Sequence, residues 1–250
     1  MRFRVASAVL GLLTAASAAP AGAQLRASRP PTVAKNLPRL LVANPHTFAT
    51  ADSAAAVRVG AGMRDKLEGI ADKWYTAIQR TQMNDALQQY GYPIDAVLPP
   101  LVARQLGSQL QARAFVLGTI SREAGKLTVE VRLLAGNDQT GQLVRMTQAD
   151  GQTPEDLGGK LGEALRGAFN ALQDAKSCEA FANSSPPNYP KAKEAAAKAL
   201  KSEPNHGPTE FCLALIAVNE KAPVDQIIGH FENAILPPVE TFREALPMVV

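Results

Sequence analysis

Residues 112–144 read ARAFVLGTISREAGKLTVEVRLLAGNDQTGQLV, and this stretch decides the fold class. The apolar run at 115–117 predicts a buried strand, and the turn EAGK at 123–126 follows it. The next strand is predicted from strict alternation, with one face formed by Leu127, Val129, Val131 and Leu133. A further apolar segment follows the turn at 136–141. The stretch therefore predicts three strands joined by two hairpins, and a sheet that is at least partly antiparallel.

Short strands and helices alternate in the sequence before this stretch. Strands are predicted at 40–43 and 74–78. A long helix begins at Asp52 or Ser53, because either side chain can cap it. Its apolar stripe has helical spacing and consists of Ala56, Val59, Met63, Leu67 and Ile70.

Three more helices complete this part of the chain. Thr81 is expected to cap the first, which ends at the sequence YGYP of residues 90–93. The second begins near Pro99 and Pro100, since proline is tolerated in a first turn. It is expected to bury Val102, Leu106 and Leu110. The third is predicted to begin at Thr153. Its apolar stripe consists of Leu157, Leu161, Leu165, Phe169 and Leu172.

In chain order these elements predict an α+β domain over residues 39–176. The order is a strand, a helix, a strand, two helices, three strands and a helix. The five-stranded sheet must be mixed, because hairpin turns join the last three strands whereas helices separate the earlier ones.

Residues 177–250 have a helical, alanine-rich composition and no strand pattern. Ala199 and Ala234 are 35 residues apart, which is the period of a helical-hairpin repeat. The last fifteen residues offer no polar capping helix, which repeat arrays need. We therefore expect an all-α helical-repeat segment, and the sequence leaves open whether it is a fragment of a longer array.

This segment resembles tetratricopeptide repeats. Residues 189–205, YPKAKEAAAKALKSEPN, follow the second-helix pattern of that family, with small Ala196 and Ala199 and a closing Pro204. Matches in the next unit are Leu213, Ala214, Phe231 and Ala234. The early Trp and Tyr of the family have no counterparts, so the resemblance covers two degenerate repeats. It implies that the segment docks a protein or a peptide.

The α/β part resembles the amino-terminal domain of TolB, which is akin to the CsgG-type periplasmic module. The resemblance rests on residues 40–45, on a short helix that starts at Arg80 and ends in QQYGY, and on residues 103–121 and 129–144. It implies a docking or assembly module without catalysis. Pore formers of the CsgG type carry a lipid-anchored cysteine and long membrane hairpins, and this sequence has neither.

Residues 1–23 form a predicted signal peptide. Two arginines precede an apolar run at 5–16, and small residues at 21–23 fit a cleavage site. The run is shorter than the ~20 residues that a spanning helix needs. We therefore expect an exported protein, periplasmic or secreted, with a proline-containing linker at 24–38 and no integral membrane segment.

Basic residues are concentrated at the amino-terminal end. Six of the 26 Lys and Arg residues precede residue 40, whereas all 23 Asp and Glu residues follow it. The formal net charge of +3 therefore does not belong to the folded part. Nucleic-acid binding loses its electrostatic support, and we expect no nucleic-acid partner.

The sequence carries no recognisable catalytic, cofactor or metal-binding motif. Gly60 and Gly62 lack the third glycine of a dinucleotide fingerprint and lie inside a helical pattern, so we expect them to pack against the sheet. Three histidines lack ligand spacing and are expected on the surface or in loops: His46, His206 and His230. We expect no enzyme activity, no cofactor and no metal.

Cys178 and Cys212 are one repeat apart, which places them at equivalent positions of successive first helices. An exported compartment permits oxidation. Packed helices, however, lie ~8–10 Å apart, whereas a disulfide needs Cα atoms within ~7 Å. We therefore expect two buried free thiols, with a disulfide as the alternative.

Two functions are compatible with this sequence. In the first, an exported, non-catalytic scaffold of the bacterial cell envelope docks a protein or peptide partner through its helical repeats. In the second, the α/β domain senses a small ligand or joins an envelope assembly, and the helical tail only packs against it. The sequence identifies neither the partner, nor the residues that bind it, nor the oligomeric state.

Overall fold

The structure is a computed structural model that describes residues 37–136 and 140–235. The predicted signal peptide, most of the predicted linker and residues 236–250 lie outside the described residues. The predictions made for those segments therefore stay predictions.

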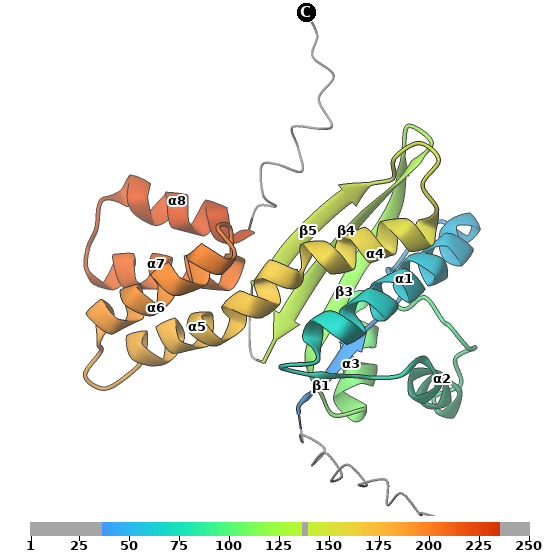
Figure 1. The fold of residues 1–250 in the computed structure, drawn as a ribbon, viewed down its shortest axis with the longest axis horizontal. Helices are drawn as coiled ribbons and strands as arrows, with labels where there is room; N and C mark the ends of the chain where they lie inside the picture. Colours follow the sequence, from blue (N-terminus) through green and yellow to red (C-terminus); the bar gives the residue numbers. More distant parts are fainter. Residues whose placement is uncertain (1–36, 137–139, 236–250) are drawn as a thin grey trace, which may run out of the picture. The chain divides into compact units, whose positions relative to one another are not determined.

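The described residues form a five-stranded mixed sheet with helices on both faces (Figure 1). The strands are β1 (Arg39–Val42), β2 (Thr76–Ala77), β3 (Ala112–Glu123), β4 (Lys126–Ala135) and β5 (Gln142–Thr147). A short 3-10 helix, η1 (Thr50–Asp52), precedes the first of the helices packed on the sheet. Those helices are α1 (Ser53–Ala71), α2 (Arg80–Gln89), α3 (Pro100–Gln109), α4 (Pro154–Ala164) and α5 (Arg166–Ala182). The chain continues with α6 (Tyr189–Ser202), α7 (Gly207–Asn219) and α8 (Val224–Ile235). The predicted α+β class, with a helical carboxyl-terminal segment, is confirmed.

The strands lie in the order β2-β1-β3-β4-β5. β1 is parallel to β2 and β3, whereas β3, β4 and β5 are antiparallel neighbours, as their hairpin turns predict. β2 is shorter than the strand predicted at 74–78, because the N–H groups of Trp74 and Tyr75 donate back to the carbonyl oxygen of Ala71. Only Thr76 and Ala77 remain to pair with β1.

Each face of the sheet has its own apolar core. On one face Val129 and Val131 of β4 are buried beneath α1, α4 and the start of α5. On the other face Phe115 of β3 packs against α2 and α3. Glu130 and Arg132 are only half-buried on that second face. The predicted register of β4 is therefore confirmed.

Helices α1 and α4 lie side by side on the first face (Figure 1). Gly62 of α1 and Gly158 of α4 permit this contact, because a Cβ on either would overlap a backbone carbonyl oxygen of the other helix. Gly60 lies against the side chain of Asn44 in the loop after β1. Gly60 and Gly62 are therefore packing features, as predicted, but they pack against this loop and α4 and not against the sheet.

The predicted cap of α2 is wrong. Gln79 is the capping residue, and its side chain and that of Gln82 form a reciprocal capping box. The backbone N–H of Gln79 lies 3.4 Å from Oε1 of Gln82. Thr81 is inside the first turn of the helix.

The predicted buried face of α3 is only partly right. Leu106 is buried, but its buried neighbours are Ala103 and Gly107, whereas Val102 and Leu110 are half-buried. The reason is the close approach at Gly107, where a Cβ would overlap side chains of β1 and β3. Close packing at this glycine turns the small residues of the helix toward the sheet.

The helix predicted from Thr153 is divided at Leu165 into α4 and α5. Thr153 caps α4 and accepts a hydrogen bond from the backbone N–H of Asp156 at 3.2 Å. All five residues of the predicted stripe are buried: Leu157, Leu161, Leu165, Phe169 and Leu172. α5 continues to Ala182, so the predicted boundary between residues 176 and 177 falls inside this helix.

The carboxyl-terminal helices form two pairs. α5 packs along α6, and α7 packs along α8 (Figure 1). The side chain of Asn188 caps α6 by accepting a hydrogen bond from the N–H of Lys191 at 3.1 Å, and the helix ends at Ser202, before Pro204. Within the described part of the chain, no helix combines the length and the apolar character that crossing a membrane requires.

Candidate partner-binding groove

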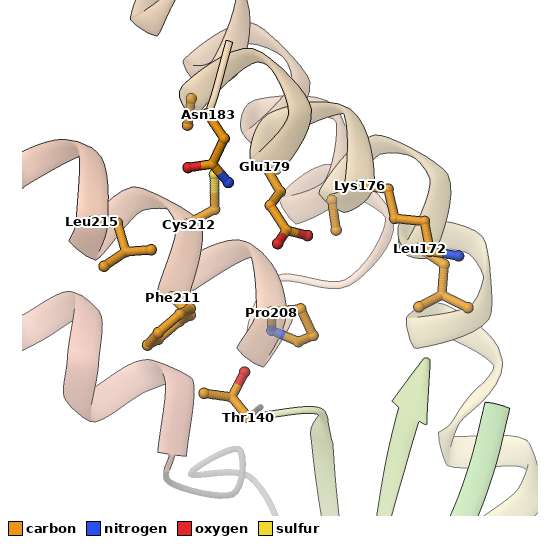
Figure 2. A pocket seen from close by; sticks show the side chains of 11 residues that line it. Thr140, Leu172, Lys176, Glu179, Asn183, Pro208, Phe211, Cys212 and Leu215 are labelled. Carbon is orange, nitrogen blue, oxygen red and sulfur yellow. The ribbon is translucent and has the colours of Figure 1, made fainter. Parts of the chain in front are cut away.

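A groove of about 270 Å³ lies between α5 and α7 (Figure 2). One face of α5 forms the first wall, one face of α7 forms the second, and Thr140 lies at one end. The lining positions recur every three or four residues on both helices, which is the spacing of one helix face. α5 and α7 contact each other less extensively than each contacts its own neighbour, α6 or α8, and a concave surface lies between them.

The exposed side chains of the α5 wall are polar. Lys176, Glu179 and Asn183 line it and are exposed, and Figure 2 shows the side chain of Glu179 directed toward α7. None of the three side chains forms a hydrogen bond or an ion pair with another residue in the described ranges. These groups can therefore bind a molecule from outside the chain.

The α7 wall is apolar. It consists of Pro208, Phe211 and Leu215, with Leu215 38% exposed. The ring of Phe211 is half-buried and packs edge-on against Phe231 of α8, with ring centroids 5.9 Å apart. This contact fixes the aromatic ring, so covering it costs little side-chain entropy.

A disulfide between Cys178 and Cys212 joins the two walls, so the prediction of two free thiols is wrong. The two Cα atoms are 6.4 Å apart. The prediction equated the distance between helix axes with the distance between Cα atoms, but each facing Cα stands about 2.3 Å from its own axis. Axes ~8–10 Å apart therefore bring facing Cα atoms within disulfide range. The bond is buried against alanines of α6: Ala192, Ala195 and Ala196.

Polar contacts attach the start of α7 to the sheet. The N–H of Gly207 donates to Oε1 of Gln142 in β5 at 2.8 Å. His206 lies in the loop before α7, as predicted, but it is fully buried, with Nδ1 2.8 Å from Oγ1 of Thr209. Burial lowers the pKa of His206 to about 4. His206 is therefore neutral at neutral pH, and it lies buried directly before the first residue of α7.

The other two histidines lie elsewhere. His46 is half-buried in the loop after β1, where its ring contacts Phe48. His230 is on α8, half-buried, with Nδ1 2.6 Å from Oε2 of Glu210 on α7. Among the described residues, no group of three or more His, Cys, Asp or Glu side chains is arranged to hold a metal ion.

A second buried polar cluster lies at the carboxyl end of β1. Arg64 of α1 donates to the carbonyl oxygen of Val42 and to Oδ1 of Asn44, both at 3.0 Å, and burial lowers its pKa to about 10. Asn44 donates to the carbonyl oxygen of Asp95 at 3.1 Å, and the carboxylate of Asp95 pairs with Arg80. These bonds hold the loop between α2 and α3 against β1. We assign the cluster a structural role, because its bonds are made inside the chain.

No protein-family model and no curated protein sequence matches this chain. Two solved structures match it in part. The carboxyl-terminal domain of LpoB from Salmonella enterica is 18% identical, with 46% of this chain and 82% of that chain covered and a TM-score of 0.32. A dodecamer of a PelC variant from Paraburkholderia phytofirmans is 12% identical, with 52% and 86% covered and a TM-score of 0.29. Likenesses this weak carry no argument about function. The resemblances to TolB and to tetratricopeptide repeats are not supported by these comparisons and stay predictions.

Proposed function

We propose that this chain is a non-catalytic interaction protein of the bacterial cell envelope and that it binds a segment of a partner protein in the groove between α5 and α7. The observation that carries the proposal is that exposed, unpartnered polar side chains on α5 face an apolar wall on α7 across one concave surface. Export rests on the predicted signal peptide at residues 1–23.

The two walls suit a peptide because a peptide is itself amphipathic. Phe211 and Leu215 supply apolar surface that a side chain of the partner can cover. Each Å² of apolar surface removed from water contributes roughly 25 cal/mol to the free energy of binding. Asn183 offers both a donor and an acceptor, which matches the N–H and C=O groups of a peptide backbone. Lys176 and Glu179 carry opposite charges, so the groove favours a segment of mixed or neutral charge.

The length of the groove limits the size of the bound segment. The α5 wall runs from Leu172 to Asn183, which is about 16 Å at the rise of an α-helix. An extended chain covers ~3.3 Å per residue, so about five residues fit. A contact of this size belongs to the small, transient class of interfaces.

Site-specific photocrosslinking tests this function. A benzophenone amino acid is placed at position 215 in the groove and, as a matched control, at Ala197, which is exposed on α6 and does not line the groove. We expect position 215 to give a discrete adduct with an envelope protein that position 197 does not give. The same adducts at both positions, or none at position 215, would refute the proposal.

Binding of the purified partner then tests the walls. Phe211→Ala removes the main apolar contact and should weaken binding at least tenfold, as expected for a buried aromatic anchor. Glu194→Ala, on the exposed side of α6, is the control and should leave the affinity unchanged. Equal affinities of the two variants would show that the partner binds elsewhere.

A further inference from the structure

We infer that the disulfide between Cys178 and Cys212 is the clamp that holds the groove in its binding-competent shape, so that only the oxidised protein binds a partner there. This inference rests on the proposed function of the groove. It concerns the regulation of the site, and the two cysteines are its positioning residues.

The first argument is the place of the bond. Cys178 lies on α5 and Cys212 on α7, so the bond connects the two helices that form the opposite walls. Cys212 itself lines the groove, between the positions of Phe211 and Leu215 on the same helix face (Figure 2). The separation of the walls at this point is therefore set by a covalent bond.

The second argument is the weakness of the other contacts between the walls. α5 packs mainly along α6 and α7 mainly along α8, so each wall is held more firmly by its own partner than by the opposite wall. The cluster behind the bond consists largely of alanines of α6, with Ile216 as its one large fully buried side chain. Alanine buries little apolar area, so this cluster alone fixes the position of α7 poorly.

The third argument is the burial of both sulfur-bearing residues, with Cys178 fully buried and Cys212 4% exposed. A buried bond is shielded from reductants once the protein has folded. Closing it converts two thiols into one disulfide, and a protein disulfide of an envelope thiol oxidase accepts the two electrons and two protons by thiol–disulfide exchange. A reducing cytoplasm opposes this step and an oxidising compartment permits it. The groove is thus completed only after export.

The variant that tests the clamp is Cys178→Ala combined with Cys212→Ala, compared with the oxidised wild type. Alanine keeps a small apolar side chain at both positions and removes the bond together with its two sulfur atoms. Amide hydrogen exchange of the free protein needs no partner. We expect the amides of α7 to exchange at least tenfold faster in the double variant, while those of β3 and β4 stay unchanged. Equal exchange of α7 in both proteins would overturn the inference.

The photocrosslinker at position 215 provides the functional readout. We expect the discrete adduct of the wild type to fall at least tenfold in the double variant and in wild type reduced under mildly denaturing conditions, and to return when the reduced wild type is reoxidised. An undiminished adduct in the double variant would also overturn the clamp. If wild type gives no adduct, the proposed function fails, and hydrogen exchange alone then decides whether the bond orders the groove.

Discussion

His206 shows how a single buried residue couples the helical segment to pH. Its ring is fully buried at the start of α7, and Nδ1 lies 2.8 Å from Oγ1 of Thr209. Burial disfavours the charged imidazolium and lowers the pKa of His206 from 6.5 to about 4. The folded protein therefore requires a neutral His206 at a point where α7 also bonds to β5 through Gly207.

We predict that His206 destabilises the fold as the pH falls below 6.5. Between pH 6.5 and pH 4 the unfolded chain binds a proton at this histidine and the folded chain does not, so the free energy of unfolding decreases with falling pH and levels off below pH 4. The full effect is about 3 kcal/mol. Urea unfolding at pH 7 and pH 4.5 measures it in wild type and in His206→Asn, which keeps a polar group beside Thr209 but does not titrate. Parallel pH profiles of the two proteins would contradict the prediction.

At the scale of the element, the contact between α1 and α4 depends on two glycines. Gly62 and Gly158 bring the two backbones together, and the ion pair of Lys66 and Glu163, at 2.8 Å, flanks the contact. The side chains of this pair are about half exposed, so the pair adds little stability. The close packing of the helices over the sheet therefore rests on the missing Cβ atoms.

Two neighbouring glycines of α4 provide a matched pair of variants. A Cβ on Gly158 would overlap the backbone of α1, whereas a Cβ on Gly159 would meet nothing within 4 Å. Gly158→Ala should lower the free energy of unfolding by about 1–3 kcal/mol, because the helices must move apart. Gly159→Ala should raise it by about 0.5–1 kcal/mol, because alanine stiffens the unfolded chain and favours the helix. Chemical denaturation of both variants measures the difference, and effects of the same sign would refute the packing argument.

At the scale of the whole molecule, stability is distributed unevenly. The sheet has two large apolar cores on its two faces, whereas the cluster among α5, α6 and α7 is small and rich in alanine. The disulfide compensates for this small core. In the chain-entropy account a bond between residues 34 apart stabilises by about 4 kcal/mol.

We predict that removal of the disulfide separates the unfolding of the two regions. Trp74 is the only tryptophan, and its ring stacks on Phe169 with centroids 6.4 Å apart, so its fluorescence reports the sheet core. Far-ultraviolet circular dichroism reports the helices. The two signals should coincide during urea unfolding of the oxidised wild type. In the double alanine variant the dichroism should begin to change at lower urea concentration than the fluorescence. Coincident transitions in the variant would show that the helical segment does not depend on the bond.

Much of the fold could be predicted from the sequence because local periodicity reports which face of an element is buried. The alternation in β4 placed Val129 and Val131 in the core, and the spacing of apolar residues gave the buried faces of α1 and α4. Turn residues then gave the two hairpins and the order of the elements. These signals act between residues that are close in the chain, so one sequence is enough to read them.

The sequence by itself determined the α+β class, the order of the strands and helices in the sheet domain, and the buried faces of β4, α1 and α4. Only the tertiary structure decided what lies opposite each buried face: the disulfide between α5 and α7, the burial of His206, the glycine contact of α1 with α4 and the groove itself. Those features depend on distances between helices far apart in the chain. Such distances are set by the volumes of all the side chains packed between the helices, and no local pattern contains them.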